Sequence, residues 1–595
     1  MAAKHIGPAF SIPRALSTIF PDSLASNALR SPAISLLQRR QFHEYFVTHL
    51  PSSSLAPDRN RGTVNHKLPR SESQPHSPSD SSSRSAASIP QHPSRDTTIV
   101  RIPIKSAKHH FGAGVSRGSR PYNEDRYQAG TIELPAFAKR QPISISKRPG
   151  GQQRDKVSQD EADQQQGATS DIGDPQVFYF SVFDGHGGSE CSEFLRDRLH
   201  GYIEEAALLF GMRSTLQKGE DGKGKTLADE SENGAAAEQD AEELQRSVVN
   251  SWKETVGGYF KRFRPEYFPA LTPSKSGDEG LQDNKAEDKL ASNSIETVLT
   301  YAFLKADLDF TTAQAQKHTA TESSSRSTGT QHSLDDPVLA DRPINDNDLL
   351  YHPDRPASQN LHKTAQRTLS HSPDLTAPIG GSTRFKGGST ASIALISTPT
   401  PTPFWHPASP STLMTAHVGD TRILLCRTSD GKAVPLTTNH HPSAPIESTR
   451  LRRYSGAFVT DSFGEERVLG LANTRAFGDI SSKRIGVSAE PQLTRVELPA
   501  AGYSFLVLVS DGVSGHLEDQ EIVDVVKEAK TPKQAADELV KFAVEVSESG
   551  DNATALVVRL GGWERRSEGG VGSMGTKEQR DYRREEAMDP RGRRM

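Results

Sequence analysis

Cysteine and long apolar runs are both scarce in this chain of 595 residues. Two cysteines are too few for a disulfide framework or a zinc site. Cys191 lies in a predicted helix and Cys426 in a predicted strand, and we expect both to be small buried apolar residues. No window approaches the roughly 20 apolar residues that a membrane-spanning helix needs, so we expect no transmembrane segment.

An excess of charge of one sign is also lacking. The formal net charge is only −4 and no basic stripe is present, which argues against a nucleic-acid partner. Apolar residues make up 33% of the chain, too few for a core that occupies its whole length. We therefore expect one folded domain that is interrupted by long polar insertions.

Acidic residues are nearly absent from the N-terminus, where Asp22 is the only one before His43. Basic residues are scattered there among serine, alanine and leucine: Lys4, Arg14, Arg30, Arg39 and Arg40. This composition is typical of an organellar transit peptide, which we place at residues 1–42. The alternative is an ordinary disordered tail, and the apolar region of a secretory signal is missing.

Polar composition divides the rest of the chain. Residues 43–97 are rich in serine and proline, which indicates a disordered linker. Ordered sequence is expected over 98–563, and a disordered charged tail over 564–595. Within the ordered part, polar stretches predict insertions at about 138–174, 213–243, 270–292 and 312–385. The last of these is far too long for an ordinary loop of a compact domain.

Short apolar segments rich in β-branched residues alternate with segments of helical periodicity. The predicted strands are 177–183, 389–397, 412–418, 421–427, 504–510 and 554–560. The predicted helices are 189–210, 244–264, 294–311, 518–529 and 531–549. Several strands follow one another without a helix between them, which favours an antiparallel α+β sandwich over a doubly wound parallel sheet.

Acidic residues stand at the edges of the apolar strands. Asp184 and Asp511 each follow a strand, and Asp551 precedes one. Glu124 and Asp125 lie in the segment "SRGSRPYNEDRY". Carboxylates that converge at one rim of a sheet repel one another unless a cation binds between them, and ligands that offer only oxygen suit Mg²⁺ or Mn²⁺. Taken singly, each of these acids also fits an ordinary turn.

Eight motifs occur along the chain in this order: "SRGSRPYNED", "FSVFDGHGG", "GGSTASIALI", "AHVGDTRILL", "LANTRAFGD", "AEPQ", "LVLVSDGV" and "SGDNATALVV". The series closely resembles that of the metal-dependent protein Ser/Thr phosphatases of type 2C, the PPM family, over about residues 108–562, and is similar to fungal mitochondrial members of it. The resemblance implies an α-β-β-α fold, in which an antiparallel β-sandwich is flanked by helices and carries long disordered insertions.

The resemblance also implies a metal centre that holds two ions, Mg²⁺ or Mn²⁺. Asp184 would bridge the two ions, helped by the backbone carbonyl of Gly185. Asp511 and Asp551 would complete the shell of one ion. Glu124 would bind the other ion, and Asp125 would act through a water bound to the metal.

His186 follows Asp184 in the glycine-rich turn "DGHGG". The resemblance implies that His186 is the general acid that protonates the departing serine or threonine oxygen. Arg120 stands where the family places the arginine that binds the substrate phosphate, and a guanidinium offers forked donors for that task. The implied reaction has no phosphoenzyme: a hydroxide held between two ions attacks the phosphorus in line.

Gly515 departs from the family pattern, which has an acid at this position. The missing acid puts in doubt a third metal site, to which Asp420 would otherwise contribute. We interpret Asp479 in "RAFGD" as structural rather than catalytic. We expect His440 and His441 to be exposed in a loop.

The resemblance therefore predicts a two-metal phosphatase that hydrolyses phosphoserine and phosphothreonine in phosphoproteins. We expect a monomer in mitochondria, or otherwise in the cytoplasm, and subunits of 2-oxoacid dehydrogenase complexes are candidate substrates. A catalytically silent member of the fold that binds phosphoproteins or regulators is the alternative, and retention of Arg120, His186 and all the acids argues against it. A nucleotide or sugar phosphatase is a third option, for which the sequence has no base-stacking or sugar-binding signature.

Overall fold

The structure is a computed structural model of the chain. The residues that it describes are 110–139, 175–216, 227–271, 293–317, 379–400, 402–452, 459–460, 466–467, 470–547, 550–566 and 574–588. Three further strands between residues 45 and 103 are described by their backbone. The transit peptide expected at 1–42 and most of the insertion expected at 312–385 lie outside the described residues.

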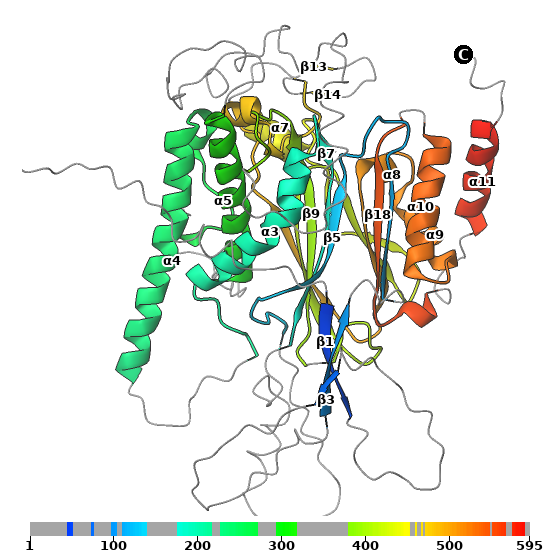
Figure 1. Ribbon diagram of the computed structural model, residues 1–595, viewed down its shortest axis with the longest axis horizontal. Helices are drawn as coiled ribbons and strands as arrows, with labels where there is room; N and C mark the ends of the chain where they lie inside the picture. The colour runs from blue at the N-terminus through cyan, green and yellow to red at the C-terminus, as the bar shows by residue number, and fades with distance from the viewer. Residues whose placement is uncertain are drawn as a thin grey trace, which may run out of the picture.

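Two five-stranded sheets form the centre of the fold (Figure 1). The first has the order β16-β10-β9-β6-β5 and consists of β5 (Arg126–Ile132), β6 (Val177–Phe183), β9 (Ala391–Ser397), β10 (Ser411–Val418) and β16 (Gln492–Leu498). The second has the order β12-β11-β17-β18-β4 and consists of β4 (Phe111–Ser116), β11 (Arg422–Arg427), β12 (Ala433–Pro435), β17 (Tyr503–Val509) and β18 (Ala553–Arg559). Every neighbouring pair in both sheets is antiparallel.

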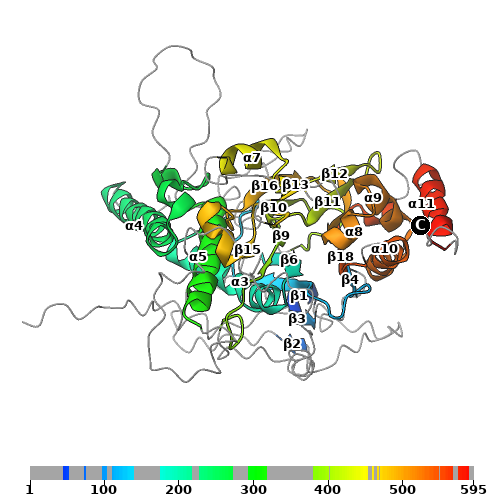
Figure 2. The same ribbon diagram turned by 90° about the horizontal axis from the view of Figure 1, so that it is seen from above.

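Helices cover the outer face of each sheet, as Figures 1 and 2 show. Next to the first sheet lie α3 (Glu190–Leu209) and α5 (Ile295–Ala315), and α4 (Leu227–Thr255) packs on the outer side of α5. Next to the second lie α8 (Asp511–Ser514), α9 (Asp519–Glu528) and α10 (Pro532–Val546), and α11 (Met574–Met588) packs on the outer side of α9 and α10. The layers are therefore helix, sheet, sheet and helix, which confirms the predicted α+β sandwich of α-β-β-α type.

Strand β6 shows how the sequence builds these layers. Its residues alternate between the two faces: Phe178, Phe180 and Val182 pack in the apolar layer between the sheets, whereas Val177 and Tyr179 pack with the helices of the outer layer. Because both faces of the strand are buried, its sequence is a nearly unbroken apolar run, with Ser181 as the exception, rather than an alternation of apolar and polar residues.

Short elements lie at the edge of the sandwich near the top of Figure 1. They are β7 (Gly185–His186), β8 (Gly388–Ser389), α7 (Pro445–Leu451), β13 (Val459–Thr460), β14 (Glu466–Arg467), β15 (Phe477–Gly478) and the 3-10 helix η6 (Ile480–Ile485). Strands β7, β8 and β15 pair into a small antiparallel sheet of their own.

Three segments carry secondary structure that their composition did not predict. Helix α4 begins at Leu227, inside the insertion expected at 213–243. Helix α11 lies inside the tail expected to be disordered at 564–595. Within and beside the linker expected at 43–97, a small antiparallel sheet is formed by β1 (Tyr45–Pro51), β2 (Ser73–Pro75) and β3 (Thr97–Pro103).

The position of α11 has a physical cause that composition does not reveal. Arg580 of α11 pairs with Glu528 of α9 at 3.1 Å, and Arg584 pairs with Glu545 of α10 at 3.0 Å. These contacts with α9 and α10 hold a helix whose own sequence is mostly polar. Among all the helices that the structure describes, none combines the length and the apolar character needed to cross a membrane.

Candidate active site

Asp184 lies where β6 ends and the small sheet of β7, β8 and β15 begins. The backbones in this sheet approach so closely that a Cβ atom on Gly388 would lie 2.5 Å from the backbone oxygen of Phe477. The glycines of the "DGHGG" and "GGST" segments therefore let three segments that are remote in the sequence meet beside Asp184.

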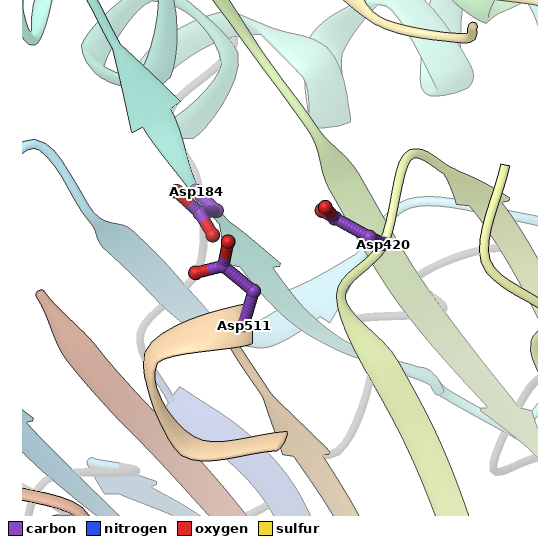
Figure 3. A group of neighbouring side chains, drawn as sticks. All are labelled: Asp184, Asp420 and Asp511. Carbon is purple, nitrogen blue, oxygen red and sulfur yellow. The ribbon is translucent and has the colours of Figure 1, made fainter. Parts of the chain in front are cut away.

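Three aspartates converge at this edge, of which Asp420 is buried, Asp184 is partly buried and Asp511 is exposed. One carboxylate oxygen from each of Asp184, Asp420 and Asp511 lies within 4.8 Å of the other two. Figure 3 shows Asp184 and Asp511 facing each other, with Asp420 directed toward them. Asp184 follows a strand of the first sheet, Asp511 follows a strand of the second, and Asp420 lies in the connection between β10 and β11. The cluster therefore bridges the two sheets.

The aspartate cluster is electrostatically costly by itself. Burial raises the pKa of Asp184 well above its usual value, and the neighbouring charge of Asp511 raises it further. Desolvation by the segments packed around its carboxylate, with the charge of Asp420 added to it, raises the pKa of Asp511 to about 7. A divalent cation between these carboxylates would relieve both the desolvation and the repulsion.

Buried carboxylate oxygens without hydrogen-bond partners give a second sign of a cation site. Asp125 is 3% exposed, and its Oδ2 accepts a hydrogen bond from the Thr554 hydroxyl at 2.7 Å. Neither Oδ1 of Asp125 nor Oδ1 of Asp420 has a hydrogen-bond partner among the described residues. Asp125 lies close enough for its charge to raise the pKa of Asp184. Because all the donors here are hard oxygens, the residues fit Mg²⁺ or Mn²⁺ better than a softer metal.

The other predicted ligands lie beside the three-aspartate cluster rather than in it. The Glu124 carboxylate accepts a hydrogen bond from the backbone N–H of Gly188, and burial raises its pKa. A Cβ atom on Gly185 would lie 2.6 Å from the backbone oxygen of Glu124, so the two segments are in contact. Arg120, half-exposed, donates from Nη2 to Oδ2 of Asp551 at 2.9 Å. The predicted phosphate-binding arginine is thus paired with a predicted metal ligand.

His186 is paired with an aspartate that the sequence analysis treated as structural. Its Nε2 lies 2.8 Å from Oδ1 and 2.9 Å from Oδ2 of Asp479. Burial alone would lower the pKa of His186, but the charge of Asp479 and the hydrogen bond to it raise the pKa to about 8. The only sequence signal for this contact is the position of Asp479 directly after Gly478 in "RAFGD".

The two loop histidines differ from each other. His440 is 3% exposed, stacks on the His417 ring at 4.8 Å and accepts a hydrogen bond through Nδ1 from the backbone N–H of Gly419 at 3.0 Å. The expectation that His440 is exposed is therefore wrong, because the turn that carries Asp420 packs against it. His441 is partly exposed, and its Nε2 lies 3.2 Å from Oδ2 of Asp420.

Comparison with known proteins agrees with this geometry. Residues 344–552 match the family described as Protein phosphatase 2C. The chain is 34% identical to "Probable protein phosphatase 2C 41" of Oryza sativa subsp. japonica over 219 residues. These are 36% of this chain and 67% of that protein. The chain belongs to the protein phosphatase 2C family and is a protein serine/threonine phosphatase of this metal-dependent class.

Two further relatives extend the comparison. "Protein phosphatase 2C homolog 4" of Schizosaccharomyces pombe is 29% identical over 469 residues, which are 79% of this chain and 84% of that protein. "Protein phosphatase 1K, mitochondrial" of Xenopus laevis is 43% identical over 153 residues, which are 25% of this chain and 40% of that protein. The similarity to the Schizosaccharomyces pombe protein therefore extends over most of both chains, whereas the similarity to the Xenopus laevis protein is confined to a part of each.

Proposed function

We propose that this phosphatase hydrolyses phosphoserine and phosphothreonine in proteins with two divalent ions, Mg²⁺ or Mn²⁺, bound at the edge of the sandwich. The observation that supports the proposal most directly is the convergence of Asp184, Asp420 and Asp511 within 4.8 Å beside the turn that carries His186. When bound, the ions would activate a water and neutralise charge on the phosphoryl group.

The chain supplies a set of oxygen ligands for these ions. We assign the ions to the carboxylates of Asp184 and Asp511, the backbone carbonyl of Gly185, and the neighbouring carboxylates Glu124, Asp125 and Asp551. Asp420 is close enough to contribute its unpaired Oδ1. The raised pKa values of Asp184 and Asp511 support this assignment, because an ion would hold both groups ionised.

Two side chains act on the substrate in this proposal. Arg120 binds the phosphate: only its Nη2 is engaged by Asp551, it is half-exposed, and a guanidinium has five N–H donors. His186 gives its proton to the departing serine or threonine oxygen, since an alkoxide leaves poorly without one. The charge of Asp479 favours the protonated ring that this step needs.

We also propose a mitochondrial location and phosphoprotein partners. The acid-poor N-terminal composition supports the location, and one relative is named as mitochondrial. Subunits of 2-oxoacid dehydrogenase complexes are the substrates that we would test first. We propose that the protein acts as a monomer. Import of residues 1–42 fused to a reporter would test the location.

The proposal is tested by phosphate release from a phosphothreonine peptide by the full chain, titrated with Mn²⁺ and with Mg²⁺. We expect turnover that requires the metal and is lost in Asp511→Asn, whereas Asp430→Asn, which alters a surface aspartate paired with Arg427, behaves as the wild type. No turnover by folded, metal-saturated protein would favour a catalytically silent binding protein. Faster turnover of a nucleotide monophosphate than of the peptide would favour a small-molecule phosphatase.

A further inference from the structure

The contact between His186 and Asp479 bears on which ring nitrogen can act as the acid. Imidazole has two nitrogens, and a partner on one of them fixes the orientation of the ring. Both carboxylate oxygens of Asp479 are within 2.9 Å of Nε2. No described residue forms a hydrogen bond with Nδ1 of His186, and the side chain is 38% exposed, so Nδ1 is the nitrogen left for a substrate to bind.

Asp479 is held in a backbone conformation that few residues adopt. Its φ angle is +43°, in the left-handed region, where aspartate and asparagine are tolerated better than other side chains with a Cβ atom. The backbone N–H of Asp479 donates to the oxygen of Gly387 at 3.0 Å. A Cβ atom on Gly388 would lie 2.5 Å from Oδ2 of Asp479, so the carboxylate occupies space that only a glycine leaves open.

A buried ion pair fixes the segment that carries Asp479. The Asp307 carboxylate accepts from the backbone N–H of Gly478 at 2.9 Å and from Lys483 Nζ at 2.5 Å. Lys483 also donates to the backbone oxygen of Ala476 at 2.8 Å. Neither charged side chain is exposed, so the segment on both sides of Asp479 is attached to helix α5.

We propose that Asp479 is a positioning residue for the phosphatase reaction: it binds Nε2 of His186 and so directs Nδ1 toward the departing oxygen of the substrate. The inference rests on the proposed function and deepens it. In the step concerned, the bond between phosphorus and the serine or threonine oxygen breaks with its electron pair on that oxygen. That oxygen takes the Nδ1 proton, while a water oxygen bonds to phosphorus and releases its own proton to solvent.

The dependence of the rate on the leaving group separates positioning from a merely structural role. The experiment compares wild type and Asp479→Asn on a phosphothreonine peptide and on 4-nitrophenyl phosphate, whose phenolate leaves without help from an acid. Asparagine is chosen because it keeps the shape of the side chain and tolerates the left-handed backbone. We expect kcat to fall by about 10- to 100-fold on the peptide and by less than about threefold on 4-nitrophenyl phosphate.

A double-mutant cycle with His186→Ala tests whether Asp479 acts through His186. We expect Asp479→Asn to have no further effect on peptide turnover once the imidazole has been removed. Nitrogen-15 NMR of labelled histidine, with the His186 signals assigned by their loss in His186→Ala, should show an altered Nε2 signal in Asp479→Asn. This measurement does not depend on turnover. Mn²⁺ affinity measured by calorimetry should be the same in wild type and in Asp479→Asn.

Three results would overturn the proposal. Equal losses on the two substrates, or no loss on the peptide, would show that Asp479 does not assist the departure of the alkoxide. A further loss in the His186→Ala background would show that it acts independently of the ring. Absence of metal-dependent turnover in the wild type on both substrates would instead overturn the proposed function, and the role of His186 with it.

Discussion

Lys483 and Asp307 form an ion pair with 2.5 Å between Nζ and Oδ2, and neither side chain is exposed to solvent. Both partners have further hydrogen bonds to the backbone of the segment that ends in Asp479. A buried ion pair is costly to desolvate, and it is tolerated where the geometry satisfies the remaining donors and acceptors. Here it links a helix of the outer layer to a segment at the candidate active site.

Removal of one partner of this pair should be strongly destabilising. We expect Lys483→Met to lower the free energy of unfolding by about 3–5 kcal/mol, because it leaves the Asp307 carboxylate buried without its cation. The double variant Asp307→Asn/Lys483→Met should recover part of this loss, since an amide oxygen can still accept from Gly478. Urea denaturation would measure the free energy of unfolding of the single and the double variant. A double variant less stable than Lys483→Met would contradict the role given to the pair.

Asp511→Asn should weaken metal binding and, in the absence of metal, stabilise the fold. Loss of a direct ligand should reduce Mn²⁺ affinity by more than about tenfold, because loss of groups outside the ligand shell already costs that much. The same change removes one of three crowded carboxylates, so the metal-free variant should melt above metal-free wild type. Isothermal titration calorimetry would measure the change in Mn²⁺ affinity. Thermal unfolding with and without EDTA would measure the change in stability. Wild-type affinity in the variant would exclude Asp511 as a ligand.

Glu447 should make the fold sensitive to acid. Burial alone would raise its pKa, but Arg450 and Arg475, with a hydrogen bond from Thr474, lower the pKa to about 2. A carboxyl whose pKa is depressed by folding stabilises the protein above its unfolded pKa, and the contribution is lost as the pH falls toward 2. We expect a contribution of about 3 kcal/mol at neutral pH.

The control for this prediction is the difference between wild type and Glu447→Gln, which cancels the titration of all other groups. Chemical denaturation at a series of pH values should show a difference of constant size above about pH 5, which shrinks toward zero as the pH approaches 2. A difference that does not change with pH would show that the stabilisation by Glu447 does not depend on its charge.

Arg580 should contribute to stability and not to catalysis. The side chain is 6% exposed and pairs with Glu528, which is 38% exposed, so packing of its stem should matter more than the ion pair. We expect Arg580→Ala to cost about 1–2 kcal/mol with no change in kcat/KM. Arg246→Ala on α4, which also breaks a pair with a glutamate but is 54% exposed, should cost less than about 0.5 kcal/mol. Equal costs would contradict the docking of α11.

The fold could be predicted best where strands are buried on both faces. Strand β6 has the predicted bounds, and β17 and β18 differ from prediction by one residue at each end. Within the two five-stranded sheets, the strands that the sequence did not predict are β4, β5, β12 and β16, which are the edge strands. An edge strand needs fewer apolar residues: β4, β5 and β16 carry glycine or charged side chains instead, and β12 has only three residues. Their pairing is decided by the neighbouring strand.

The candidate site could be predicted in its residue types but not in its contacts. The motifs singled out Asp184, Asp511 and His186, and the structure brings the two aspartates together. Asp420 was assigned only to a doubtful third site, although it belongs to the same cluster. The contact between Asp479 and His186 had no sequence signal beyond the preceding glycine.

The sequence by itself determined the local features of this protein: which segments are apolar enough to be central strands, where glycines allow tight turns, and which acids stand at strand ends. Only the tertiary structure decided which of these acids face one another. Asp184 and Asp511 follow strands of different sheets, and the distance between their carboxylates depends on how the apolar faces of the two sheets pack. Such a distance is a property of the packed core and not of any local segment, because no short stretch of chain joins the two side chains.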